Sequence, residues 1–476
     1  MMRRGAKINR SLMFSSADAL LRGTEHGSAV ISRDLRGGGA KTLSDLRRDV
    51  HALASFLSSR GISRAAIVTD DTYLFETAFF ACAAAGTVPV LPASVSEGYL
   101  SRCSRLFDAV LAEDGAVSGR DGTFSIAMLA AEYEPRGAMP PVSDTSPYMM
   151  FTSGSTGAPK LVTHTFSDLF LEARASFRLL SGALSRSDFA CATVPCRHAF
   201  GLAFRVMMPL LTLLPASVRC AVYEEEFSAM AGIPFVVTSP AFLKRLDGVR
   251  RTDASAVMSA GGVLPAFAAE LAEKAFGCQV TEIYGSTEAG AFASRTGHQG
   301  EAWKPLPGNF ATVNDGMLFV QSPYARGGHL FRTDDLAESA PDGRFILRGR
   351  AGRAVKIEDN LISLDDVDAC LRSHEWIRES RSVRLIRGGR EEIGAAAILS
   401  EKGREALTAL GTGKFEIALR GSLRSALDPL EIPRSWRFVE RFPESSMGKI
   451  KDSDILELFG AGGKYGAGHG TEAGQE

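Results

Sequence analysis

Hydrophobic positions in the first part of the chain alternate between helical and strand-like spacing. Segment 42–61 has one apolar face and is closed by Gly61, which predicts a helix. Short apolar stretches at 65–70 and 87–92 predict strands, with a helix over 73–86 between them. This βαβ rhythm predicts an α/β fold whose parallel sheet has helices on both faces. The apolar face of the first helix is formed by Leu46, Val50, Leu53 and Leu57.

The same rhythm resumes in the middle of the chain. A helical pattern covers 167–180 and an apolar strand covers 189–195. Segments 235–240 and 256–262 run from apolar residues into Pro- or Gly-containing turns. Turns of this kind place ligand-binding loops at the carboxyl ends of parallel strands. We therefore expect part of a binding site after these strands.

The character of the sequence changes near its last third. From about Leu318 onward, short strands and turns are predicted, as at 318–323 and 343–350, and a second unit of strands and helices begins at Val355. The glycine-rich polar stretch 460–476 is predicted to be disordered. A chain of 476 residues is too long for one ordinary core, so we expect two to four domains or subdomains.

Composition narrows the functional classes. The chain is 45% hydrophobic and 23% charged, which is typical of a globular protein, and its net charge of −1 favours neither a nucleic-acid nor a membrane partner. A basic N-terminal stretch has no apolar run after it, so we expect no signal peptide and no membrane helix, and a cytoplasmic location. Seven cysteines without CxxC spacing argue against a zinc site or a disulfide framework.

The stretch FTSGSTGAPK, residues 151–160, combines glycines, hydroxyls and a lysine, as a polyphosphate-binding loop requires. It is not a Walker loop, because Pro159 lacks the N–H of the second glycine and Leu161 replaces the metal-binding hydroxyl. An ordinary surface loop is the alternative. The candidate nucleotide-binding residues here are Thr152, Ser153, Gly154, Ser155, Thr156, Gly157 and Lys160.

Further motifs follow this loop in a fixed order. Together they resemble the adenylate-forming superfamily, which comprises acyl-CoA synthetases, adenylation domains of peptide synthetases and related ligases. The matching stretches are VPCRHAFGL at 194–202, SAGGVLP at 259–265, YGSTEAG at 284–290, FRTDDL at 331–336, GRAGRAVKIEDNLISLDDVD at 349–368 and PESSMGKIK at 443–451. The closest resemblance is to stand-alone acyl- and aryl-AMP ligases of aryl polyene-type pathways.

The resemblance implies a role for each matching residue. Glu288 would hold Mg²⁺ and Thr287 would contact the α-phosphate of ATP. Asp335 and Arg350 would contact the ribose or phosphate, and Lys449 would be the catalytic lysine. Members of the adenine and acyl sites, by the same resemblance, are Gly261, Gly262, Tyr284, Gly285 and His198, of which Tyr284 could instead fill the core.

The resemblance also implies a domain arrangement. It predicts a large adenylation domain at 1–349, a hinge at 350–352 and a small mobile α+β domain at 353–459. Three residues depart from the family's pattern: Asp334 stands at a usual glycine, Gly352 at a usual Asp or Lys, and Asp359 at a glycine common in enzymes that use CoA.

The resemblance implies an ATP-dependent ligase that forms an acyl- or aryl-adenylate and passes the acyl group to a phosphopantetheine thiol. The expected substrate is a small aryl or medium-chain carboxylic acid. Asp359 favours an acyl carrier protein as the acceptor, and free CoA is the alternative. Two other classes stay open: a non-catalytic nucleotide-binding module, and a P-loop kinase or ATPase, which the missing Walker residues disfavour.

Overall fold

The structure is a computed structural model that divides into two compact units. The first unit is Met1–Ala311 with Val320–Phe331, and the second is Thr312–Phe319 with Arg332–Glu476. The hinge predicted at 350–352 is a statement about motion, which a single structure does not test, so it stays a prediction. The structure describes residues 11–35, 37–115, 121–152, 160–246, 248, 250–296, 302–357, 360–387, 390–424, 426–427, 429–443 and 450–460.

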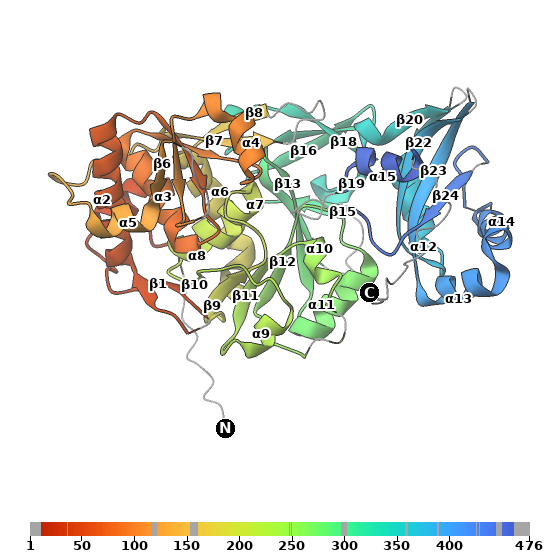
Figure 1. Ribbon diagram of the computed structural model, residues 1–476, viewed down its shortest axis with the longest axis horizontal. Coiled ribbons are helices and arrows are strands. Elements are labelled where there is room, and N and C mark those ends of the chain that lie inside the picture. Colours follow the sequence, from red (N-terminus) through yellow and green to blue (C-terminus); the bar gives the residue numbers. More distant parts are fainter. Residues whose placement is uncertain are drawn as a thin grey trace, which may run out of the picture. The chain divides into compact units, whose positions relative to one another are not determined.

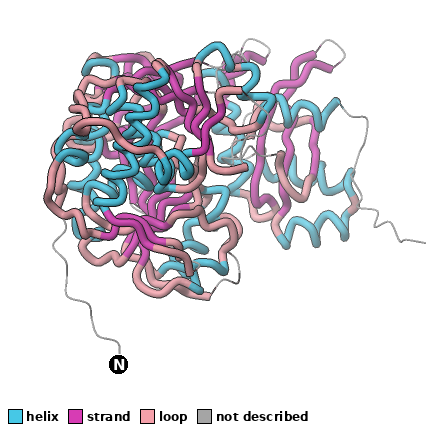
Figure 2. Tube along the Cα trace, turned by 60° about the vertical axis from the view of Figure 1, so that its left-hand side comes forward, coloured by secondary structure: helices cyan, strands magenta, loops and turns pink. Residues whose placement is uncertain are grey.

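A six-stranded sheet lies at the start of the first unit, in the order β6-β5-β3-β4-β7-β8. All its pairs are parallel except β7 with β8, which confirms the predicted parallel α/β arrangement. Figure 2 shows helices in cyan around the magenta strands of this unit. The strands are β3 (Arg64–Val68), β4 (Val88–Leu91), β5 (Ala109–Ala112), β6 (Thr123–Ser125), β7 (Pro147–Thr152) and β8 (Lys160–Thr165).

Helix α2 (Leu43–Arg60) shows why the sequence pattern was informative. Thr42 and Asp45 form a capping box at its start, and Gly61 ends it in the left-handed conformation at φ 61°. Its apolar face packs against α3 (Thr72–Ala85) and α5 (Ile126–Glu132), as Figure 1 shows at the red and orange end of the chain. The first and longest core cluster of the chain forms here.

A second sheet of the first unit contains, in order, β15-β14-β13-β12-β11-β9-β10-β1-β2. Its central strands β13, β12, β11 and β9 are parallel to one another. Helix α6 (Phe166–Leu184) packs with both main core clusters of this unit. The strands are β1 (Val30–Arg33), β2 (Ala40–Thr42), β9 (Phe189–Ala192), β10 (Ala216–Ser217), β11 (Pro234–Thr238), β12 (Ala256–Ser259), β13 (Val280–Ser286), β14 (Gly290–Thr296) and β15 (Ala302–Pro305).

The remaining helices of the first unit are shorter, apart from α11 (Ala266–Phe276), which follows β12 and covers a third core cluster. The CRHAFGL stretch leads into a short helical segment that contains one π-helical turn at Leu202–Met207. Within the described ranges, no helix combines the length and the apolar character needed to cross a bilayer. The other helices are α1 (Ala17–Arg22), α4 (Glu97–Arg102), α7 (Ala199–Gly201), α8 (Met208–Leu211), α9 (Glu225–Ala229) and α10 (Pro240–Leu243).

The second unit combines a three-stranded sheet with helices. In this sheet β22 (Ile377–Arg387) pairs antiparallel with β23 (Arg390–Leu399), which pairs parallel with β24 (Ser435–Phe438). A core cluster joins the sheet to α12 and α14, with Trp436 at 4% exposure. The other elements are β16 (Phe310–Asn314) and β17 (Met317–Gln321) at the unit boundary, β18 (Phe331–Ser339), β19 (Phe345–Arg350), β20 (Ala354–Ile357), β21 (Asn360–Ser363), α12 (Leu364–Ser373), α13 (Glu401–Leu410), α14 (Thr412–Leu423) and α15 (Asp452–Gly460).

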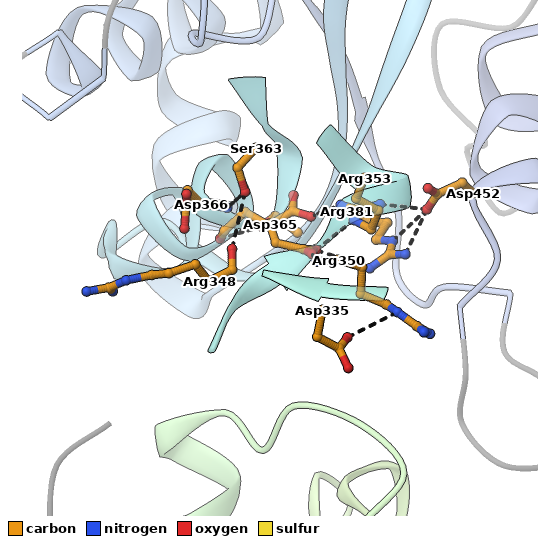
Figure 3. Close-up of polar contacts among 11 residues, drawn as sticks. Asp335, Arg348, Arg350, Arg353, Ser363, Asp365, Asp366, Arg381 and Asp452 are labelled. Carbon is orange, nitrogen blue, oxygen red and sulfur yellow. Dashed lines mark hydrogen bonds and ion pairs between the residues drawn. The ribbon is translucent and has the colours of Figure 1, made fainter. Parts of the chain in front are cut away.

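One buried arginine ties three parts of the second unit together. Arg353 is 5% exposed, and its guanidinium donates to Asp365 and Asp452 at 2.6 Å each and to Asp368. Figure 3 shows Arg353 between Asp365 and Asp452. The Arg381 guanidinium also pairs with Asp452, at 2.7 Å. Burial raises the pKa of Asp368 to about 6 although Arg353 acts in the opposite direction. The cluster joins α12 to α15, because Asp365 and Asp368 lie on the first helix and Asp452 begins the second.

We predict that Arg353→Met destabilises the second unit by about 3–5 kcal/mol, because it leaves the buried Asp368 carboxylate without its cation. Urea unfolding followed by tryptophan fluorescence in a Trp303→Phe background reports on this unit, since Trp436 lies in its core, Trp376 packs against that core, and Trp303 belongs to the first unit. The matched control is Arg344→Met, whose pair with Asp342 is solvent-exposed and should change stability by less than about 1 kcal/mol. Equal effects of the two substitutions would contradict the prediction.

Candidate active site

The candidate site of the first unit forms where parallel strands end. Because β9, β12 and β13 are parallel members of one sheet, their carboxyl ends lie along one edge. The stretch CRHAFGL follows β9, Gly261 and Gly262 follow β12, and the YGSTEAG motif ends β13. Three motifs that are far apart in the sequence are therefore delivered to the same side of the sheet.

The YGSTEAG motif is the tip of the β13–β14 hairpin, in which Gly285 pairs with Ala291 and Ser286 with Gly290. A Cβ on Gly285 would lie 2.2 Å from the Gly290 carbonyl oxygen, so no larger residue fits. Gly290 has φ +69°, in the left-handed region. These two glycines narrow the hairpin so that residues 287–289 form its tip.

Thr287 and Glu288 are presented at this tip, and both are half-buried. Within the described part of the chain, Glu288 forms no ion pair, so its carboxylate is available to another cation. A carboxylate oxygen is the ligand type that Mg²⁺ prefers, and Mg²⁺ characteristically takes its remaining ligands from phosphates and water. The donor set at the tip therefore fits the expected metal.

Tyr284 is half-buried on β13 and contacts two aromatic rings. Its ring centroid lies 6.3 Å from that of Phe292 and 5.8 Å from that of Trp303. On the neighbouring strand end, Gly261 and Gly262 are exposed, and Gly261 has φ +94°. The two glycines are therefore accessible to a ligand. Because Tyr284 already packs against two rings, its role in adenine binding stays a prediction.

His198 begins the short helix α7, and its carbonyl accepts from the backbone N–H of Leu202 at 2.7 Å. Its neighbour Arg197 is 6% exposed and pairs with Asp70 at 2.6 Å. Gly201 packs so closely that an added Cβ would lie 2.0 Å from the Pro195 carbonyl oxygen. The backbone of this turn is therefore closely packed against the residues that precede it.

The predicted phosphate loop connects two paired strands. Thr152 ends β7 and faces Lys160, the first residue of β8. Ser153, Gly154, Ser155, Thr156 and Gly157 lie outside the described residues, as do Asp359 and Lys449. The structure thus describes where this loop starts and ends, while its contacts stay a prediction.

Two buried side chains that sequence analysis did not identify hold the hairpin tip from behind. On β8, His164 lies with its Nε2 2.6 Å from the Thr287 carbonyl oxygen, and on α6 the Glu172 carboxylate accepts from the Ala291 N–H at 2.6 Å. Both are 7% exposed. A histidine in the middle of a strand and a glutamate on the apolar face of a helix are the signals that could have singled them out.

The second unit brings Asp335 and Arg350 together, as their shared predicted role requires. They are cross-strand partners on β18 and β19, and Arg350 Nε lies 3.3 Å from Asp335 Oδ1 (Figure 3). The Arg350 side chain is 63% exposed, and Asp335 donates its own N–H to Thr333 Oγ1. Both Asp334 and Gly352, which depart from the family pattern, are exposed.

We predict that the stability of the wild-type chain falls relative to that of Glu172→Gln as the pH rises from about 4.5 to 7. Burial raises the pKa of Glu172 from 4.5 to about 7, and the Ala291 N–H opposes this only in part. A raised carboxyl pKa means that the folded state keeps a proton that the unfolded chain has lost, so stability present at low pH is lost on the way to pH 7. Glutamine does not titrate and lacks this dependence.

Urea unfolding midpoints of both proteins at half-unit pH steps test this expectation. The free energy of unfolding of Glu172→Gln, relative to that of the wild-type chain, should rise by at most about 3 kcal/mol between pH 4.5 and 7. Above pH 7 the difference between the two proteins should stay constant. Parallel profiles across the whole pH range would show that the Glu172 carboxyl group has an ordinary pKa.

Comparisons with known proteins agree with this architecture. The family model described as AMP-binding enzyme matches residues 101–319. The chain is 26% identical to a benzoate–CoA ligase from Thauera aromatica over 382 residues, 70% of each protein. It is 25% identical to a 4-coumarate–CoA ligase from Rhodobacter capsulatus, covering 66% of this chain and 77% of that protein.

Among solved structures, a benzoate CoA ligase from Burkholderia xenovorans LB400 has the same fold. The TM-score is 0.78 at 21% identity, and the alignment covers 92% of this chain and 99% of the other. Together with the ordered motifs, these matches make the chain similar in sequence to AMP-binding enzymes over residues 101–319 and similar in fold to a benzoate CoA ligase.

Proposed function

We propose that the protein is an ATP-dependent acid–thiol ligase. It forms an acyl- or aryl-adenylate with release of pyrophosphate, and then transfers the acyl group to a phosphopantetheine thiol with release of AMP. The observation that carries the proposal is the narrow β13–β14 hairpin, whose tip presents Thr287 and Glu288 at the carboxyl edge of the sheet. Among the described residues, Glu288 forms no ion pair.

In the first step the substrate carboxylate attacks the α-phosphorus of ATP, the bond from this phosphorus to the bridging oxygen breaks, and pyrophosphate carries away the electron pair. Negative charge accumulates on the phosphoryl oxygens, so positioned donors and cations accelerate the step. Thr287 would donate to the α-phosphate, and residues 152–160 would enclose the β- and γ-phosphates. Mg²⁺ on Glu288 supplies further charge neutralisation when it is bound.

The family resemblance supplies the candidate nucleoside contacts. Gly261, Gly262 and Tyr284 would form the adenine site, and Asp335 would accept hydrogen bonds from the ribose hydroxyls. Arg350 already lies against Asp335, so it would hold that carboxylate in place or turn its exposed guanidinium to phosphate. Lys449 would contact the substrate carboxylate and the phosphate in the adenylation state.

The substrate we propose is a small aryl acid. Two relatives are named for benzoate and 4-coumarate, both aryl acids. In this chain the ring or acyl chain would contact His198 and the apolar residues that follow it, on the segment that comes after β9 in the sequence. A medium-chain acid would use the same segment.

We propose an acyl carrier protein as the acceptor, with free CoA as the second candidate. Asp359 replaces the glycine that lets the pantetheine arm of CoA pass close to the backbone, and a carrier protein presents its own pantetheine. The names of both curated relatives favour CoA instead, so the acceptor must be measured. The seven cysteines form no disulfide, which suits a reducing compartment such as the cytoplasm.

We expect the purified protein to release pyrophosphate and AMP when it is given ATP, Mg²⁺ and an aryl acid. The assay uses benzoates, hydroxycinnamates and fatty acids, each with CoA or with a phosphopantetheinylated carrier protein. Thioester on the carrier protein alone supports the full proposal, and thioester on CoA alone corrects the acceptor. Release of ADP would indicate kinase or ATPase chemistry, whereas ATP binding without pyrophosphate exchange would indicate a non-catalytic module.

We expect Lys449→Ala to lower adenylate formation by about 10²-fold or more while ATP affinity is retained, because a positioned positive charge is lost from the transition state. ATP–pyrophosphate exchange measures the rate, and calorimetry measures the affinity. The matched control is Lys451→Ala, two residues further along and exposed. Near-normal exchange in Lys449→Ala, or an equal loss in Lys451→Ala, would exclude the assigned role.

A further inference from the structure

A small cavity lies against the hairpin tip, where Thr287 and Gly290 form part of its wall. Its volume is about 10 Å³, close to what one water molecule needs. Its walls come from β7, β8, α6, the CRHAFGL segment, the hairpin tip and Tyr324. The exit of the phosphate loop, the acyl-site segment and the Thr287 turn therefore share one buried junction.

Side chains from three other parts of the chain hold the tip backbone at this junction. The Glu172 carboxylate accepts from the Ala291 N–H, and the Tyr324 hydroxyl donates to the Ala291 carbonyl. His164 Nε2 lies 2.6 Å from the Thr287 carbonyl oxygen. Both ends of the segment Thr287–Ala291 are thus fixed by groups outside the hairpin.

The contact of Glu172 with the tip is also steric. A Cβ added to Gly290 would lie 3.1 Å from Glu172 Oε1 and 3.2 Å from Tyr324 Cδ2, so the tip backbone packs directly on these two side chains. Glu172 lies on α6, a 19-residue helix whose neighbouring residues are part of the main core. The carboxylate is therefore attached to one of the best-anchored elements of the first unit.

Burying a carboxyl group is costly, and within the described part of the chain Glu172 forms no ion pair that would compensate for it. The ionisable groups facing Glu172 are Tyr148 on β7, His164 on β8, Asp168 on its own helix and Tyr324. An alanine or leucine at position 172 would pack against the core without the cost of burying a carboxyl group. The specific bond to the Ala291 N–H is what a carboxyl group adds.

We propose that Glu172 is a positioning residue for the nucleotide site: by holding the Ala291 N–H, it fixes the turn that carries Thr287 and Glu288. The role of this turn in catalysis rests on the proposed function, but the positioning itself does not. His164 and Tyr324 complete the same support from the Thr287 and Ala291 carbonyl groups.

The first test compares three variants by hydrogen–deuterium exchange. In Glu172→Ala we expect exchange in the peptide spanning 285–292 to be about tenfold faster or more, because one hydrogen bond and its anchor are lost. Glu172→Gln keeps a carbonyl oxygen at this position and should restore most of the protection. The control is Ser176→Ala, one helical turn further along, where a buried hydroxyl makes no hydrogen bond within the described residues.

A kinetic measurement complements the exchange experiment. If the turn is displaced, Glu172→Ala should lower the rate of ATP–pyrophosphate exchange by about 10²-fold, while the KM of the acid changes little. Glu172→Gln should recover most of that rate. A uniform increase of deuterium exchange over the first unit would show that Glu172 only supports the core and would overturn the proposal, as would unchanged protection of 285–292.

The two readouts separate this inference from the proposed function. If the wild-type chain forms no adenylate with any acid, the proposed ligase activity fails, yet the protection of 285–292 in the variants still decides whether Glu172 holds the turn. If adenylate forms and Glu172→Ala affects neither exchange of the turn nor catalysis, the ligase proposal stands and the positioning role is wrong.

Discussion

The close approach of two backbone strands at the tip of the β13–β14 hairpin is the constraint on which the candidate site depends. At Gly285 the opposite carbonyl oxygen stands 2.2 Å from where a Cβ would be, so the narrowest part of the hairpin admits no side chain. The two candidate site residues of this motif, Thr287 and Glu288, therefore lie at the tip beyond the narrow part of the hairpin. Within the tip the Ala289 N–H donates to Ser286 Oγ at 3.1 Å, and His164, Glu172 and Tyr324 on other elements add further support.

Helix α6 supplies part of that support because of where its apolar face lies. Phe166 and Leu169 pack in one core cluster of the first unit, and Leu184 packs in the other. The helix is therefore fixed at both ends by apolar burial, which is the dominant favourable term in folding. A single polar side chain on that face, Glu172, can then hold a neighbouring backbone N–H with little freedom to move.

Sequence patterns predicted the elements better than the contacts. Helix α2 was recoverable because its caps at Thr42 and Gly61 and its apolar stripe are all local signals. The motif residues at strand ends were recoverable for the same reason. The contact of His164 with the Thr287 carbonyl was not, because it joins residues 123 positions apart. Register likewise decides that Asp335 faces Arg350, and one-dimensional spacing does not determine register.

The second unit has a related dependence on one buried group. If the chain hinges at 350–352, Arg353 lies just beyond the hinge and its bonds to Asp365 and Asp452 stay intact, so α12 and α15 move as one body. Lys449, three residues before Asp452, would be carried with them. The bond from the Arg350 N–H to Asp365 Oδ2, at 2.8 Å, spans the hinge itself. The Ser363 hydroxyl also donates across the hinge to the Arg348 carbonyl oxygen at 3.3 Å. Hinging must therefore strain or break these bonds, while the buried ion pairs that hold the moving body together are spared.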